Sequence, residues 1–338
     1  MLFHSQMRRF IYFIIFISLF STLLASNPAN AAGADSHKNI SIAVIPERGD
    51  LDFWDLLKKG VSKAATDDGK IKIFWIEPAG YGSFKEQRNK LEWCLNNNID
   101  AVVISPVHGL RLKKALQKVV RKGIPVIQMV SKSPISKSGY VHSDNFNGGT
   151  LAADFLQGEL NGSGSVILGL FTQGNSPVNS RVEGFKKRLK MIGSKIKIAN
   201  SIYVGKSLKE GASKTRIAMY GNDTPSSKTG IKAVIGFNES SSEILLHTLS
   251  QMNKLDGIKF VAFNPDPQMI KGIKSGKIAA AIAQDPYEIG RLAVTQAVMA
   301  ARGHKIPSNT KTNVYLITKD NLDNPKIQEI LGLKKRTL

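Results

Sequence analysis

Cysteine is almost absent from this chain of 338 residues. The single residue of this type, Cys94, excludes an intrachain disulfide. It lies in the segment KLEWCLNNN, which we expect to be helical, and the sequence around it offers no activating base. We therefore interpret Cys94 as a small buried side chain rather than a catalytic thiol.

Motifs for catalysis and for nucleotide or metal binding are also missing. The chain contains no G-x-G-x-x-G, no G-x-x-x-x-G-K-[ST], no H-E-x-x-H, no C-x-x-C and no G-x-S-x-G. The six histidines are scattered, without partners at ligand spacing. A carboxylate pair formed by Asp144 and Asp285 would suit a glycosidase, so an exported hydrolase is kept as a remote alternative. We expect no catalytic residue, no metal and no cofactor.

Acidic residues are few. There are 26 of them against 47 lysines and arginines, which gives a formal net charge of +21. Nucleic acid is the first partner to consider for such a surplus. The lysines, however, are scattered in pairs, with no basic helix and no RNA-binding aromatic strand. We expect a generally basic surface and no nucleic-acid partner.

Long hydrophobic runs are lacking except at residues 10–24, and this run is shorter than the ~20 residues of a spanning helix. It follows the basic residues Arg8 and Arg9 and precedes the small residues of NPANAA, the order found in a secretory signal peptide. We expect residues 1–31 to be a signal peptide cut near Ala31, and the mature protein to be periplasmic and not membrane-spanning. A membrane anchor is the alternative.

After residue 38, short runs rich in Val and Ile alternate with amphipathic helical segments. Examples of the runs are ISIAVI (40–45), DAVVIS (100–105) and IKAVIGFN (231–238). Such runs suit strands covered on both faces, and their alternation with helices predicts parallel sheets. About 300 residues exceed what one core usually fills. The expected fold class is α/β, with two doubly wound, Rossmann-like lobes.

Polar and aromatic residues gather at the ends of the predicted strands. Ligands of open parallel sheets bind beyond the carboxyl ends of the strands. Here those ends carry amides such as Asn238, Asn264 and Gln284, together with several aromatic residues. This composition predicts a cleft that holds a small polar molecule by hydrogen bonds and ring faces.

The order of several segments resembles the ribose-type (type 1) periplasmic binding proteins over about residues 40–320. The segments are FWDLLKKG, IDAVVISP, KGIPVIQM, VHSDNFNGG, NSRVEGF, AVIGFNESS, KFVAFNPDP and KIAAAIAQDPYEIG. The resemblance implies a hinge of three crossovers, placed near His142–Ser143, Gln284–Asp285 and Tyr315–Leu316, whose closure traps a ligand. The implied lobes are residues 38–143 plus 285–314 (N-terminal) and 144–284 plus 315–332 (C-terminal).

At several positions where the ribose-type family binds a pentose, this chain has different residues. Val130-Ser131 stands where the family has an Asp-Arg pair, Asn179 where it has Arg, and Asn264 where it has Asp, whereas Asn238 and Gln284 match. Losing these charged groups removes strong bidentate contacts with a polyol.

A narrower likeness involves the turn Ala-Gly-Tyr (79–81) and the cysteine in the next helix, which resemble the TorT-type periplasmic sensor proteins for trimethylamine N-oxide. That resemblance implies an aromatic cage of Trp54 and Tyr81, with Phe53, around a methylated nitrogen.

Together these features predict a non-enzymatic solute-binding protein that is a monomer when free. The main hypothesis is a TorT-like receptor whose partner is an inner-membrane sensor histidine kinase. The alternative is the sugar-binding component of a ribose-type importer, with an ABC permease as partner. The residues expected to line the cleft are Phe53, Trp54, Tyr81, Ser131, Asp144, Asn179, Asn238, Asn264 and Gln284.

Two further features permit two interpretations each. Arg181 and Glu183 are either ligand contacts or members of salt bridges on a helix. The pair Gly148-Gly149 either binds an anion at a helix N-terminus or allows close helix packing, and we favour the packing role.

Overall fold

The computed structural model describes residues 39–78, 80–220, 230–334 and 336. The signal peptide expected at 1–31 and Ala79 of the predicted turn lie outside them.

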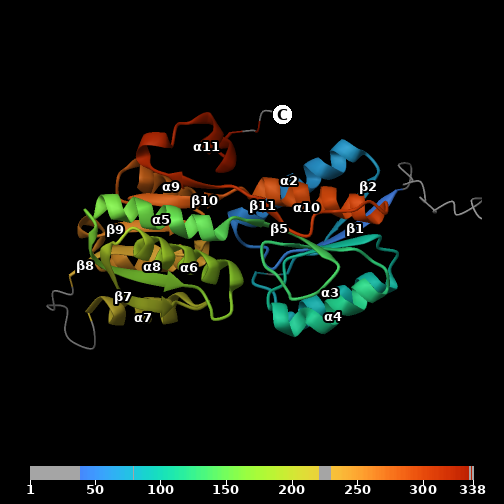
Figure 1. Cartoon of the computed structure of the whole chain (residues 1–338), viewed down its shortest axis with the longest axis horizontal. Coiled ribbons are helices and arrows are strands. Elements are labelled where there is room, and N and C mark those ends of the chain that lie inside the picture. Colours follow the sequence, from blue (N-terminus) through green and yellow to red (C-terminus); the bar gives the residue numbers. More distant parts are fainter. Residues whose placement is uncertain (1–38, 79, 221–229, 335, 337–338) are drawn as a thin grey trace, which may run out of the picture. The chain divides into compact units, whose positions relative to one another are not determined.

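The chain forms two six-stranded sheets (Figure 1). The first sheet has the order β11-β5-β4-β3-β1-β2, and its strands are β1 (Ile40–Ile45), β2 (Ile71–Trp75), β3 (Ala101–Ile104), β4 (Val126–Met129), β5 (Ser138–Ser143) and β11 (Thr310–Thr312). The second has the order β12-β10-β9-β8-β6-β7, with β6 (Ser163–Leu170), β7 (Lys195–Tyr203), β8 (Ile231–Gly236), β9 (Lys259–Phe263), β10 (Ala280–Gln284) and β12 (Val314–Ile317). All pairs are parallel except β10 with β12. This is the predicted α/β fold.

Helices cover both faces of each sheet. On the first sheet, α2 (Asp52–Asp68) and α10 (Pro286–Ala301) pack on one face, and α3 (Phe84–Asn96) and α4 (Gly109–Arg121) on the other. On the second, α5 (Asn145–Glu159) and α6 (Ser176–Met191) cover one face. The other face carries α7 (Leu208–Tyr220), α8 (Glu239–Gln251), α9 (Pro267–Lys274) and α11 (Pro325–Ile330).

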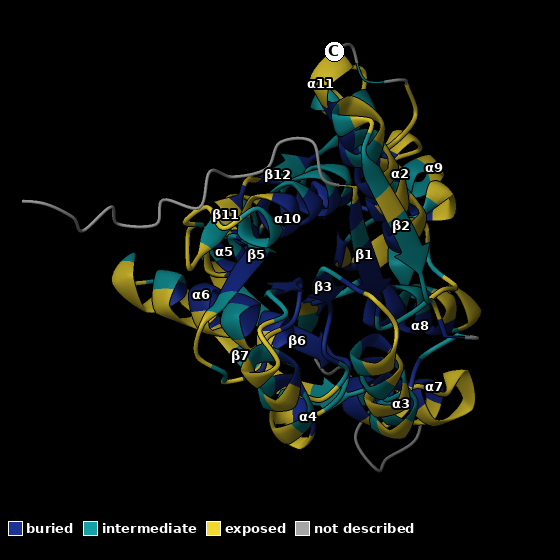
Figure 2. Ribbon diagram, turned by 90° about the vertical axis from the view of Figure 1, so that its right-hand side faces the viewer, coloured by how far each residue is buried: buried dark blue, intermediate teal, exposed yellow. Residues whose placement is uncertain are grey.

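Because helices cover both faces of each sheet, the central strands are apolar on both faces. In β1, Ile42 and Val44 belong to the core under α2 and α10, whereas Ala43 and Ile45 belong to the core under α3 and α4. Figure 2 shows β1, β3 and β6 largely buried between helices whose outer surfaces are exposed. Because successive side chains of a strand point to opposite faces, both sets must be apolar.

The chain passes between the two sheets three times. The first passage follows β5 at Asp144, and the second follows β10 at Asp285. Since β11 pairs in the first sheet and β12 in the second, the third lies at Asn313. Tyr315 and Leu316, where the sequence placed this passage, are inside β12.

Each sheet has one helix pair held at backbone contact by glycines. A Cβ on Gly149 of α5 would lie 1.8 Å from the Arg181 carbonyl oxygen of α6, and one on Gly184 would lie 2.0 Å from that of Phe146. In the other pair, Gly60 of α2 and Gly290 of α10 meet their partner helices in the same way. The packing role expected for Gly149 is confirmed, and the contact fixes where α6 presents Arg181.

Candidate functional site

A small cavity of about 60 Å³ lies where the carboxyl ends of the two sheets meet. Residues from β-strand ends and helix starts of both sheets line it. Seven of the nine residues selected from the sequence are among them: Phe53, Trp54, Tyr81, Ser131, Asn238, Asn264 and Gln284.

The other two selected residues do not lie in this cavity. Asp144 caps α5, where its Oδ1 accepts a hydrogen bond of 3.2 Å from the Asn147 amide, and its Oδ2 pairs with Lys311 at 3.2 Å. Asn179 is an exposed residue of α6. Its neighbour Val178 faces the cavity instead, because a helix turns by about 100° per residue.

Two aromatic pairs border the cavity. The rings of Phe53 and Trp54 meet edge to face at 5.2 Å, and both also pack in the core under α2 and α10. Tyr81 meets Phe171 edge to face at 5.6 Å. Lys206 Nζ lies 3.7 Å from the centroid of the Tyr81 ring, so the ring already holds a cation of the chain itself. This contact speaks against Tyr81 as an open cage wall for a methylated nitrogen.

Glu47, which follows β1, lines the cavity as an anchored carboxylate. Its Oε2 accepts hydrogen bonds from the hydroxyls of Ser105 at 3.1 Å and Ser131 at 3.0 Å. Burial raises the pKa of Glu47, while the two hydroxyls act in the opposite direction. Within the described residues Oε1 has no hydrogen-bond partner and is open to a ligand. Glu47 is not among the nine residues selected from the sequence.

The backbone that presents Ser131 is strained. Val130 has a φ of 59°, a left-handed conformation that a β-branched residue rarely adopts. Its amide donates to the Val141 carbonyl at 3.0 Å, and its carbonyl accepts from the Tyr140 hydroxyl at 2.9 Å. These bonds hold the turn that directs Ser131 toward Glu47.

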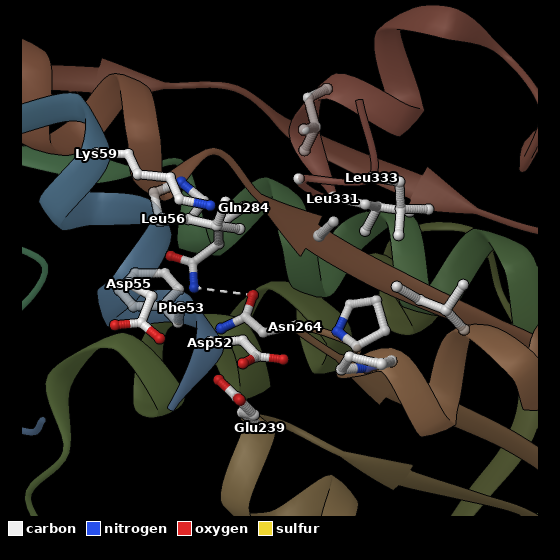
Figure 3. Close-up of a pocket in the computed structure, with 17 residues that line it drawn as sticks. Asp52, Phe53, Asp55, Leu56, Lys59, Glu239, Asn264, Gln284, Leu331 and Leu333 are labelled. Atoms are coloured by element: carbon white, nitrogen blue, oxygen red, sulfur yellow. Dashed lines mark hydrogen bonds between the residues drawn. The ribbon is translucent and has the colours of Figure 1, made fainter. Parts of the chain in front are cut away.

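Three amide side chains at the ends of strands in the second sheet line the cavity. In each of them, one polar atom is already hydrogen-bonded within the protein. Asn238 Oδ1 caps α8 by accepting from the Ser241 amide at 3.0 Å. Asn264 Oδ1 accepts from Gln284 Nε2 at 3.1 Å, a bond also visible in Figure 3. In the part of the chain that the structure describes, the remaining ends have no partner: Nδ2 of both asparagines and Oε1 of Gln284. These three amides thus offer the cavity two donor nitrogens and one acceptor oxygen.

Arg181 is a buried cation at the base of the cavity and only 3% exposed. Its Nε donates to Asn145 Oδ1 at 2.8 Å, and its Nη1 donates to the Phe237 carbonyl at 2.7 Å. Burial lowers the pKa of Arg181 to about 9, so the guanidinium stays charged at neutral pH. Among the described residues it makes no salt bridge, and Nη2 has no hydrogen-bond partner. By contrast, Glu183 pairs with Lys187 at the surface.

The other chemical expectations concern cysteine, metals and membranes. Cys94 is buried, which confirms its expected role, and burial raises the pKa of its thiol to about 12. The described ranges contain no group of three His, Cys, Asp or Glu side chains placed to hold a metal. A search of the same ranges finds no helix with the length and apolar character that crossing a membrane requires.

Comparison with known proteins gives one family match, "Periplasmic binding protein domain", over residues 42–305. The ribose import binding protein of Haemophilus influenzae is 27% identical over 293 residues, 86% of this chain and 94% of the relative. The D-allose-binding periplasmic protein of Escherichia coli is 23% identical over 75% of this chain and 82% of the relative.

A solved structure of a solute binding protein is also similar to this chain. The solute binding protein of an ABC transporter from Agrobacterium vitis, with bound alpha-D-tagatopyranose, has a TM-score of 0.78 and 26% identity. The match covers 86% of this chain and 99% of that chain.

Proposed function

Because this chain belongs to the periplasmic binding protein family, we propose that it is a periplasmic receptor for a monosaccharide and delivers it to an ABC permease. The relatives named above are binding proteins for ribose and allose, and the similar structure holds a tagatose. They support the importer alternative, and no TorT-type protein is among them. With the Lys206 contact on Tyr81, they lead us to set aside the methylamine-sensor hypothesis and its kinase partner.

One observation carries this proposal: polar atoms without partners converge on one cavity beside aromatic rings. Glu47 Oε1 and Gln284 Oε1 accept hydrogen bonds, Arg181 Nη2 and the asparagine Nδ2 groups donate them, and Phe53 and Trp54 provide a ring surface. A sugar hydroxyl both donates and accepts, so this mixture suits a polyol. Glu47 and Arg181 supply the charged contacts that Val130-Ser131 and Asn264 do not.

The size of the cavity implies that the lobes separate to admit a ligand. Ligand sites usually measure 300–1,000 Å³, whereas this one measures about 60 Å³. The three passages at Asp144, Asp285 and Asn313 are the points where such a hinge motion would turn. Nothing in this role requires catalysis, and we propose a binding protein rather than an enzyme.

Thermal unfolding with separate additions of D-ribose, D-allose, D-arabinose, D-tagatose, D-xylose and trimethylamine N-oxide tests the function. A ligand at about 100 times its Kd stabilises the folded state by about 2.7 kcal/mol. We expect at least one sugar to raise the melting temperature and trimethylamine N-oxide to leave it unchanged. A rise with trimethylamine N-oxide and with none of the sugars would overturn the proposal.

A further inference from the structure

A second, larger cavity of about 250 Å³ adjoins the central one (Figure 3). The two cavities share four lining residues, Phe53, Glu239, Asn264 and Gln284. Segments from α2, the start of α8, the end of β9 and the end of α11 surround the larger cavity. The proposed sugar site does not account for this space.

The lining of the second cavity has two chemically different parts. One part carries the carboxylates of Asp52, Asp55 and Glu239. The other part is apolar and consists of Leu56, Ile270, Ile330, Leu331 and Leu333. Lys59 also lines the cavity, but Figure 3 shows it at the Leu56 end, away from Glu239.

Glu239 is the feature that points to a ligand. It is only 4% exposed, and within the described ranges its carboxylate has neither a hydrogen-bond nor an ion-pair partner. In Figure 3 the carboxylate points into the cavity toward Asp52. A buried, unpaired carboxylate destabilises a protein, so a positively charged partner would remove a substantial cost.

We propose that this cavity binds a small organic ammonium ion, with its charged nitrogen between Glu239 and Asp52 and its alkyl part against Leu331 and Leu333. A metal ion fits poorly, because the described residues include no metal-ligating group of three and half of the lining is apolar. A neutral sugar would leave the carboxylates without a countercharge, and an anion would be repelled by them.

The protonation of Glu239 agrees with this assignment. Burial raises the pKa of Glu239 well above its ordinary value, the nearby carboxylates of Glu243, Asp52 and Asp266 raise it further, and Arg48 acts in the opposite direction. A bound ammonium ion would favour the charged form and release the proton.

Glu239 lines both cavities, whereas Asp52, Leu331 and Leu333 line only the larger one. The ammonium position is therefore assigned to the larger cavity, and the titration with n-butylammonium tests it without any sugar present.

Calorimetric titration of the purified protein with n-butylammonium chloride tests this site. Ammonium chloride lacks the alkyl part, and n-butanol lacks the charge. We expect n-butylammonium to bind at least tenfold more tightly than either compound. Equal affinity for n-butanol and n-butylammonium would overturn the proposal without the need for any variant.

Two substitutions on α8 then locate the charge. Glu239→Gln is expected to weaken n-butylammonium binding at least tenfold. Glu243→Gln is the matched control, since Glu243 lies one turn further along α8 and outside this cavity, and it is expected not to weaken binding. Both variants are first checked for cooperative thermal unfolding. If the two variants bind n-butylammonium equally well, the assignment to Glu239 is wrong.

Discussion

Arg48 Nη1 donates a hydrogen bond of 2.8 Å to Ser240 Oγ, although the two residues lie 192 positions apart in the chain. Arg48 follows β1 of the first lobe, and Ser240 is in the first turn of α8 in the second. Asp50 orients the guanidinium by accepting from Nε at 2.7 Å and from Nη2 at 2.9 Å. The bond therefore joins a preorganised cation of one lobe to the other lobe beside the cavity.

Ser240→Ala removes this link without changing the charge. A hydrogen bond to a charged group contributes about 1.5–3 kcal/mol, and the bond exists only while the lobes are together. We expect the variant to bind its sugar roughly tenfold or more weakly, because closure then costs more. Calorimetry measures the affinity, with Ser250→Ala as control, because Ser250 is on the same helix but does not line the central cavity. Unchanged affinity in Ser240→Ala would show that the bond does not contribute to closure.

Trp54→Ala tests the aromatic pair as a structural element. Trp54 is 4% exposed and packs in the core under α2 and α10, and large-to-small changes of buried aromatics cost about 3–5 kcal/mol. We expect a loss of that order in guanidinium-induced unfolding. Trp93→Ala, at a site 37% exposed, should cost about 1 kcal/mol or less. Equal losses would contradict the core role of Trp54.

Glu239→Gln should stabilise the folded protein, and the gain should depend on pH. The unfolded pKa is near 4.5 and the folded pKa is raised well above it. Between these values the folded state holds a proton that the unfolded state has lost, so the wild type loses stability as pH rises. Each pKa unit corresponds to about 1.4 kcal/mol.

The measurement for Glu239→Gln is the melting temperature at pH 4 and pH 8, without added amine. We expect the variant to exceed the wild type at pH 8 and to match it at pH 4. Glu183→Gln, at an exposed carboxylate paired with Lys187, is the control and should show no such gain. A gain of equal size at both pH values would mean that charge burial is not its cause.

Glu47→Gln should weaken sugar binding by roughly tenfold or more, since a bond to a charged acceptor contributes about 1.5–3 kcal/mol. Burial raises the pKa of Glu47, so the carboxylate begins to take up a proton at a higher pH than an ordinary glutamate. The affinity of the wild type for its sugar should therefore fall as pH is lowered toward that pKa.

Calorimetric titrations at pH 7 and pH 5 check this, with Glu77→Gln as control because Glu77 pairs with Lys58 outside the cavity. The wild type and Glu77→Gln should lose affinity at pH 5, and Glu47→Gln should not. If Glu47→Gln retains the acid loss of the wild type, another group is responsible.

The fold could be predicted because its signal is repeated along the chain. Apolar runs such as Ile40–Ile45 are needed wherever a strand is covered on both faces, so central strands such as β3, β4 and β8 repeat this pattern, whereas the edge strands β7 and β11 are more polar. The position of the site could also be predicted, because ligands of parallel sheets bind beyond the carboxyl ends of the strands. This gave Asn238, Asn264 and Gln284 their place beside the cavity.

The errors concern directions of side chains, which local sequence does not determine. Asn179 and Arg181 lie on the same helix, and only the packing of α6 against Gly149 decides which one faces the cavity. Asp144 was selected as a strand-end carboxylate, but its oxygen caps α5. Glu239 was not selected, because the sequence does not show that this carboxylate at the start of a helix is buried.

The glycine contacts between α2 and α10 have a consequence for the order of folding. Helix α10 supplies Ile289, Ala293 and Val294 to the first core, yet these residues follow the whole of β6 to β10 in the chain. The first core therefore cannot be completed until α10, which follows β1 by more than 200 positions, has been synthesised. Contacts between residues so far apart in the chain give this core a high contact order, which favours slow folding. A nascent chain that stops before Pro286 has only α2 on this face of its first sheet, so the part that α10 covers stays open to proteases and chaperones.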